Sequence, residues 1–182
     1  TYCLPDGYAA DGRPRFLEQD EIARLLRAFA ALGMRKVRLT GGEPSVRKDL
    51  PSIIETAAAT PGIEKIALTT NGSALAVKAE ALRRAGLDRV TVSLDSLDDE
   101  LFQRMNDVRF PVGRVLDGIA AAHAAGLGPI KLNMVVRRGL NDHEVVGMAE
   151  HFKGSPYTLR FIEYMDVGAS NGWKLDDVVP SA

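Results

Sequence analysis

The chain has 182 residues, of which 46% are hydrophobic and one is a cysteine, and it carries 23 basic against 24 acidic side chains. That length can bury the core of one domain, and no compositional break divides residues 1–182. A net charge of −1 provides no basic excess, so neither a nucleic-acid nor a membrane partner is expected. A single cysteine permits no internal disulfide and favours a cytoplasmic address, and alone it argues against a cysteine-ligated metal cluster.

Hydrophobic periodicity predicts strands and helices that alternate along the chain. Apolar residues three and four apart predict a helix over 18–32, and alternation predicts a strand over 36–40. Pro51 suits the first turn of the next helix. Further strands are predicted at 65–70, 89–94, 130–136 and 158–164, and further helices at about 75–85, 99–106, 112–125 and 142–152.

The start of the last predicted helix carries a capping signature. Asn141 is followed three residues later by Glu144, which is typical of a capping box. In such a box each side chain accepts a hydrogen bond from the other residue's backbone. Both residues are therefore assigned a structural role.

Strands that alternate with helices of this length predict βαβ units and a parallel sheet. The predicted strands are apolar on one face and polar on the other, with Arg38, Thr91, Ser93, Lys131 and Asn133 on the polar face. An open parallel sheet covered by helices on both sides would be apolar on both faces. The pattern therefore predicts an α/β barrel with a ligand-filled lumen and about five parallel strands.

The unusual residues of the sequence follow the predicted strands. Gly41, Gly42 and Glu43 follow the first strand, and further polar motifs end at Gly72, Asp95 and Asp166. The carboxyl ends of parallel strands meet at one edge of a sheet, so we expect one composite site there. Two glycines let a ligand lie against the main chain, and Glu43 adds an acceptor.

Two cations, Arg38 and Lys131, fall on the polar face of the predicted barrel. A buried cation without a partner is costly, so each needs a carboxylate or an anionic ligand. With hydroxyls such as that of Thr69 nearby, the pair suits a phosphorylated or nucleotide substrate. The alternative is that Asp95 or Glu163 neutralises them in salt bridges within the chain.

Several strings of residues together resemble a known family. The Tyr-Cys-Leu-Pro at 2–5 resembles the end of the cysteine loop of radical S-adenosylmethionine enzymes, and the Thr-Gly-Gly-Glu-Pro at 40–44 resembles their GGE motif. Longer strings are similar to one branch of that superfamily, the GTP 3′,8-cyclase family of molybdenum cofactor biosynthesis, over nearly the whole chain. These strings lie at 37–44, 68–72, 92–97 and 160–166.

The resemblance implies a fold, two cofactors and a set of site residues. The fold is a TIM-like (βα)6 barrel, here a partial one that lacks its first strand. The cofactors are a 4Fe-4S cluster, with Cys3 as one of its ligands, and S-adenosylmethionine. The residues implied to contact S-adenosylmethionine are Tyr2, Gly41, Gly42, Glu43, Ser93 and Met165. Those implied to contact GTP are Arg38, Thr69 and Lys131.

The resemblance also implies a lyase reaction. A 5′-deoxyadenosyl radical abstracts the 3′ hydrogen of GTP, and the ribose radical attacks C8 of guanine to give 3′,8-cyclo-7,8-dihydro-GTP. The protein orients the reactants and excludes water. The implied partners are GTP, an electron donor and the cyclic pyranopterin monophosphate synthase that acts next.

Three departures from the family pattern shape the expectation for this chain. Two further cluster cysteines and the strand before them are missing, and so is a later segment with a second cluster. In addition, residues 6–14 resemble a shortened or altered form of the loop that follows the cluster. We therefore expect that these 182 residues are an internal fragment without cyclase activity. The absent strand would leave an open seam beside Lys36–Thr40 that favours a homodimer.

Other functions remain open from the sequence. A radical S-adenosylmethionine enzyme that modifies peptides would share the GGE motif but would not need Arg38 and Lys131. A cluster-free nucleotide-binding module would bind GTP tightly and would not depend on Cys3. An aldolase-like barrel would use Lys131 for a Schiff base, although its predicted neighbours suit that chemistry poorly.

Overall fold

A sheet of five parallel strands organises the molecule, for which a computed structural model describes residues 17–167 and 172–181. The spatial order β1-β2-β3-β4-β5 follows the chain. Each strand lies within one residue of its predicted bounds, so the predicted parallel α/β sheet is confirmed. The strands are β1 (Lys36–Leu39), β2 (Lys65–Thr70), β3 (Arg89–Ser93), β4 (Lys131–Val136) and β5 (Thr158–Glu163).

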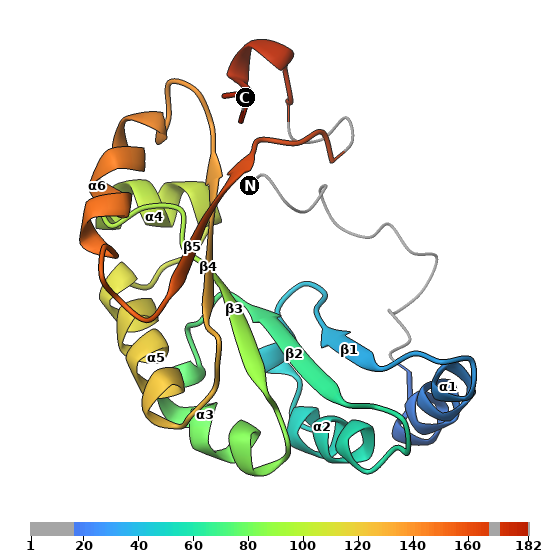
Figure 1. The fold of residues 1–182 in the computed structure, drawn as a ribbon. Helices are drawn as coiled ribbons and strands as arrows, with labels where there is room; N and C mark the ends of the chain where they lie inside the picture. The colour runs from blue at the N-terminus through green and yellow to red at the C-terminus, as the bar shows by residue number, and fades with distance from the viewer. Residues whose placement is uncertain (1–16, 168–171, 182) are drawn as a thin grey trace.

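The sheet curves, and helices line its outer, convex side (Figure 1). The helices are α1 (Gln19–Ala31), α2 (Leu50–Ala58), α3 (Leu75–Arg84), α4 (Asp99–Asn106), α5 (Val112–Ala124) and α6 (Val145–His151). Helix α1 lies beyond β1 at one end, and no described helix covers the concave side (Figure 1). None of the helices in the described part has the length and apolarity needed to cross a membrane.

The register of the strands divides their side chains between two faces. Residues paired in a parallel ladder point to the same side of the sheet. On the convex side, Leu68, Leu132 and Met134 are 0% exposed and form the core with the helices. On the concave side, the pairs Thr69↔Thr91 and Thr91↔Lys131 join polar residues of three strands in one row. The partial barrel therefore has an apolar outer side and a polar inner side, as the alternation predicts.

Strands β1 and β5 form the two edges of the described sheet. Within the described residues, β1 pairs only with β2 and β5 only with β4. The seam predicted beside Lys36–Thr40 thus lies at a sheet edge. Pairing of this edge with a second chain stays a prediction, whose test is the molecular mass in solution at high concentration.

A close approach of two glycines holds the loop after β2 against α5. Gly72 has φ +79°, a backbone conformation that residues with a side chain rarely adopt. A Cβ on Gly118, in α5, would come within 2.5 Å of the Gly72 carbonyl oxygen. The loop can therefore reach its position only because both residues lack side chains.

The predicted capping box of Asn141 and Glu144 is wrong. The chain there begins with a 3-10 turn, Asp142–Glu144, and the Asn141 side chain caps neither this turn nor α6. The Asn141 amide instead donates from Nδ2 to the carbonyl oxygens of Asp95 (2.8 Å) and Val135 (2.9 Å). Its Oδ1 accepts from the backbone of Arg137 at 2.8 Å. Tertiary partners have replaced the local cap.

Candidate functional site

The loops that follow the strands lie together at the carboxyl edge of the sheet, as parallel topology requires. At this edge Gly41 and Gly42 are exposed, and a Cβ on either would meet nothing within 4 Å. Gly41 has φ +150°, which favours glycine. The backbone groups of this loop are therefore accessible to a ligand, as predicted from the glycine pair.

Glu43 bridges two of the site loops. Its Oε1 accepts from the Thr70 hydroxyl at 2.7 Å and from the Ser45 backbone at 2.9 Å. Its Oε2 accepts from the backbone of Asn71 at 2.6 Å. These bonds tie the glycine loop after β1 to the end of β2. The observed contacts make Glu43 a positioning residue, and its contact with a cofactor stays a prediction.

Ser93 and Met165 lie near the carboxyl ends of β3 and β5. Ser93 is partly buried and pairs in register with Asn133 of β4, while Met165 is 51% exposed. Tyr2 and Cys3 lie outside the described residues. Among the described residues no group of three or more His, Cys, Asp or Glu side chains could hold a metal ion.

Arg38 lies on the concave face and contacts two threonines of the neighbouring strands. Its Nη1 lies 3.0 Å from the Thr69 hydroxyl oxygen and 3.3 Å from that of Thr91. Two of the three residues predicted to contact the substrate, Arg38 and Thr69, are therefore in direct contact. Thr91, only 4% exposed, joins them, and the sequence analysis did not assign it a site role.

Neither Arg38 nor Lys131 forms an ion pair with a carboxylate of the described residues. The two carboxylates weighed as partners are engaged elsewhere. Asp95 is 0% exposed and accepts from the backbone of Val135 at 2.8 Å. The backbone N–H of Ser181 donates to Glu163 at 2.7 Å and lowers the pKa of that carboxyl. The alternative of internal salt bridges is therefore not observed among the described residues, and both cations, Arg38 exposed and Lys131 partly exposed, stay available to an anionic ligand.

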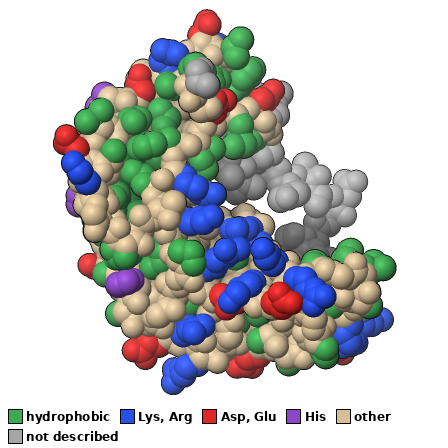
Figure 2. Space-filling model, in the orientation of Figure 1, with side chains coloured by type: hydrophobic (Ala, Val, Ile, Leu, Met, Phe, Trp, Pro, Cys, Tyr) green, Lys and Arg blue, Asp and Glu red, His purple; other side chains and the backbone are tan. Residues whose placement is uncertain are grey.

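Further cations line the same face. Arg89 shares its face with Arg38, because both are register partners of Ala67. Arg160 shares it through Asn133, whose Oδ1 accepts from Arg160 Nε at 2.9 Å and Nη2 at 2.6 Å. Figure 2 shows Lys and Arg side chains gathered in the hollow of the molecule. Arg89 and Arg160 were not predicted as site residues, although the same alternation applied to β3 and β5 places both on this face.

A C-terminal segment folds over the ends of β4 and β5. Arg137 forms an ion pair with Asp177 at 2.8 Å, and its guanidinium lies 5.0 Å from the ring centroid of Tyr164. Trp173 donates from Nε1 to the Tyr164 carbonyl oxygen at 3.0 Å. These contacts hold the chain immediately before Met165. Trp173 is therefore part of the support of the site.

The site can hold anions and a polar ligand together. The open backbone at Gly41 and Gly42 can bind the ammonium and carboxylate of an amino acid, and the concave cations can bind phosphates. The described residues thus fit S-adenosylmethionine at the loop edge. The fit of an iron–sulfur cluster rests on Cys3, which lies outside them.

The chain has clear relatives. The family model of the Radical SAM superfamily matches residues 1–152. A GTP 3′,8-cyclase from Xanthomonas axonopodis pv. citri (strain 306) is 52% identical over 186 residues, covering 100% of this chain and 55% of that protein. One from Stenotrophomonas maltophilia (strain K279a) is 55% identical over 174 residues, covering 95% and 53%. The chain therefore spans about half the length of these curated relatives.

A solved structure supports the fold. The structure of anSMEcpe with bound AdoMet matches with a TM-score of 0.71 and 16% identity, and covers 91% of this chain and 48% of that chain. At this identity the likeness concerns the fold alone. It agrees with the curved parallel sheet and outer helices described above (Figure 1).

Proposed function

The chain belongs to the radical S-adenosylmethionine superfamily, and from this membership we propose that the whole protein is a GTP 3′,8-cyclase of molybdenum cofactor biosynthesis. The observation that carries the proposal is the cationic concave face beneath an open glycine loop. A nucleoside triphosphate needs such cations, and the sequence around them is about half identical to enzymes named for GTP. Residues 1–182 would form a single barrel unit of that protein.

Membership in this superfamily implies a 4Fe-4S cluster and S-adenosylmethionine as cofactors. When bound, they supply the one-electron chemistry that removes a hydrogen atom from the ribose of the substrate. Gly41 and Gly42 would bind the methionine part of S-adenosylmethionine through their open backbone, with Ser93 and Met165 beside it. Tyr2 and Cys3 keep the roles implied for them by the resemblance.

Arg38, Thr69 and Lys131 would hold the triphosphate of GTP. Arg38 already contacts Thr69 at 3.0 Å, so the guanidinium is oriented before a ligand arrives. A guanidinium offers several N–H donors in a planar fork that matches phosphate oxygens, so Arg38 would act as a positioning group. Glu43 would serve the reaction indirectly, by holding the glycine loop against β2.

The remaining partners and the location belong to the same proposal. An electron donor would reduce the cluster, and the cyclic pyranopterin monophosphate synthase would use the product. A homodimer through the β1 edge would cover that edge. The single cysteine in 182 residues favours the reducing cytoplasm.

The test is an activity assay on the full-length protein, reconstituted with iron and sulfide without oxygen. With GTP we expect 5′-deoxyadenosine and a cyclised product in a ratio near one to one. When ATP replaces GTP, we expect little of either compound. Lys131→Met should reduce turnover of GTP about tenfold or more, because it removes a charged partner of the phosphates. Turnover of peptides in place of GTP would support a peptide-modifying enzyme and contradict the proposal.

A further inference from the structure

We propose that Arg89 is a third phosphate-binding cation, which makes the site select a nucleoside triphosphate over a monophosphate. The inference rests on the proposed nucleotide site and names a specificity-determining residue within it. It concerns the number of phosphates and not the base. Arg89 belongs neither to the motifs in the sequence nor to the residues implied by the resemblance.

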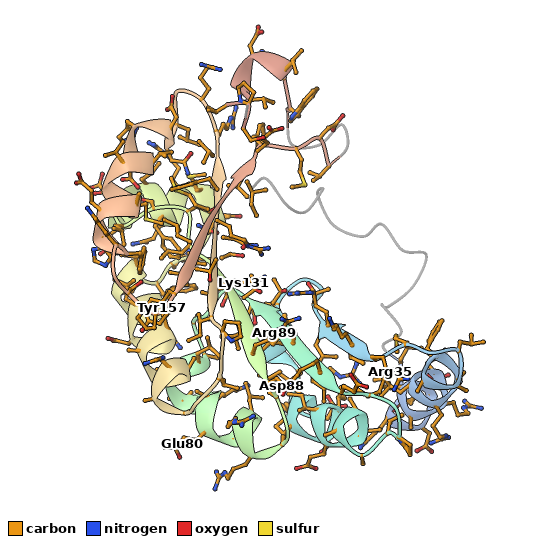
Figure 3. All side chains as sticks on the ribbon, viewed as in Figure 1. Arg35, Glu80, Asp88, Arg89, Lys131 and Tyr157 are labelled. Carbon is orange, nitrogen blue, oxygen red and sulfur yellow. The ribbon has the colours of Figure 1, made fainter. Side chains whose placement is uncertain are left out.

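Three cations surround one buried threonine on the concave face. This threonine is Thr91, in the middle of β3. Arg89 lies two residues before it on the same face of the strand, and Lys131 is its register partner on β4. Arg38 reaches the Thr91 hydroxyl oxygen from β1 at 3.3 Å. Figure 3 shows Arg89 and Lys131 on the concave side of neighbouring strands. The charges of three strands therefore converge on one region.

Arg89 lacks the partner that a structural arginine would have. Its Nε is buried and has no hydrogen-bond partner among the described residues. No ion pair of the described residues includes Arg89. Three like charges on one face of neighbouring strands repel one another, and a polyanion bound there would offset that repulsion.

Lys65 provides a contrast on the same face. It precedes Ala67 by two residues and so points to the concave side, as Arg89 does. Its Nζ, however, forms an ion pair with Asp88 at 3.2 Å, and Asp88 also accepts from the backbone of Ile66. Lys65 is therefore neutralised within the chain, whereas Arg89 is not.

The position of Arg89 along β3 indicates which phosphate of the nucleotide it would contact. It is the first residue of β3, two residues or about 7 Å deeper in the barrel than Thr91 and Lys131. The ribose must lie near the glycine loop at the carboxyl edge, where the reaction begins. The phosphate farthest from the ribose then lies deepest, beside Arg89, and a monophosphate would not reach it.

The experiment measures binding of GTP and GMP to the purified protein by isothermal titration calorimetry. Arg89→Gln should weaken GTP binding about tenfold or more, because a charge-assisted bond to phosphate is lost, and change GMP binding less than about twofold. Lys65→Gln, the matched control, should change both affinities by less than about twofold. Equal losses for GTP and GMP in Arg89→Gln, or no loss for GTP, would overturn the inference.

A thermal unfolding curve decides whether Arg89→Gln is folded. If it is not, Arg89→Lys takes its place, because it keeps the charge but loses the planar fork that binds phosphate. We then expect a smaller loss, again for GTP alone. An affinity for GTP equal to that of the wild type would contradict the inference.

A second pair of ligands separates this inference from the proposed function. If ATP binds as tightly as GTP and no cyclised product forms, the proposed cyclase is wrong. The inference about Arg89 still stands in that case if Arg89→Gln weakens ATP about tenfold and leaves AMP within about twofold. It is wrong if ATP and AMP change together.

Discussion

The two faces of the same sheet contrast sharply. On the convex face, Leu68 and Leu132 are fully buried under the helices, and each contributes to one continuous core. Their immediate neighbours Thr69 and Lys131 lie on the concave face, where polar and charged groups stay partly open. One step along a strand therefore separates a residue of the core from one that lines the candidate site. A substitution at a convex-face position should therefore lower the free energy of unfolding, whereas one at the adjacent concave-face position should mainly weaken ligand binding.

The largest expected effect on stability lies on the convex face. Leu68→Ala should lower the free energy of unfolding by about 3 kcal/mol, because it removes a buried side chain and leaves a cavity. Thr69→Ala, one residue on, should cost less than about 1 kcal/mol but weaken GTP binding. Urea unfolding and calorimetry measure the two quantities. Similar stability losses at both positions would break the contrast between the faces.

Asn141→Ala tests a buried side chain that hydrogen-bonds the backbone near the carboxyl ends of β3 and β4. Asn141→Ala should cost about 2–3 kcal/mol, because three backbone groups of Asp95, Val135 and Arg137 lose their partner. The expected change is larger than that of Asn106→Ala, whose side chain donates a hydrogen bond to the Phe102 carbonyl oxygen within its own helix. Urea unfolding of both variants gives the comparison, and equal values would contradict it.

Arg38→Met tests the concave face directly. Stability should change by less than about 1 kcal/mol, because an exposed cation with two threonine contacts contributes little to folding. GTP affinity should fall about tenfold. Thermal unfolding and calorimetry on the same sample provide both numbers. A stability loss comparable to that of Leu68→Ala would show that Arg38 is structural.

The smallest expected effect is electrostatic and lies at the start of α2. Arg47 hydrogen-bonds Asp49 at 2.7 Å and holds the pKa of that carboxyl below its ordinary value. A lowered folded pKa stabilises the protein above the ordinary aspartate pKa, and this contribution is lost as pH falls through the folded value. The pair is partly exposed, so we expect less than about 1 kcal/mol.

The pH dependence of unfolding checks this prediction. Asp49→Asn should be less stable than the wild type at pH 6, and the difference should shrink towards pH 3. Asp117→Asn, on the exposed side of α5, is the control. A difference that stays constant down to pH 3 would contradict the assigned ion pair.

Much of the fold was accessible from the sequence because periodicity reports burial directly. All five strands were placed within one residue, and the alternation correctly put Arg38, Thr69 and Lys131 on one face. The resemblance to GTP 3′,8-cyclases is confirmed by relatives at 52% and 55% identity. These features depend on local pattern or on whole strings of residues.

What the sequence did not reveal depends on partners far apart in the chain. Asn141 resembles a helix cap locally, but its partner Asp95 lies in the loop after β3 and its partner Val135 lies in β4. Alternation places Arg89 and Thr91 on one face of β3, but the alignment of Arg89 with Arg38 and Lys131 needs the register of neighbouring strands, which no local pattern contains. The same holds for Glu43, whose bonds to Thr70 and Asn71 cross from one loop to the next.

The register has a consequence for finding such sites in other chains. Arg38 is the third of four residues in β1, while Arg89 is the first residue of β3, and both lie level with Ala67. The strands are staggered, so one layer of the barrel draws on late positions of one strand and early positions of another. A search that aligns strands by their ends would miss this layer. Cations that line the concave face of related barrels should instead be sought along the diagonal that the stagger defines.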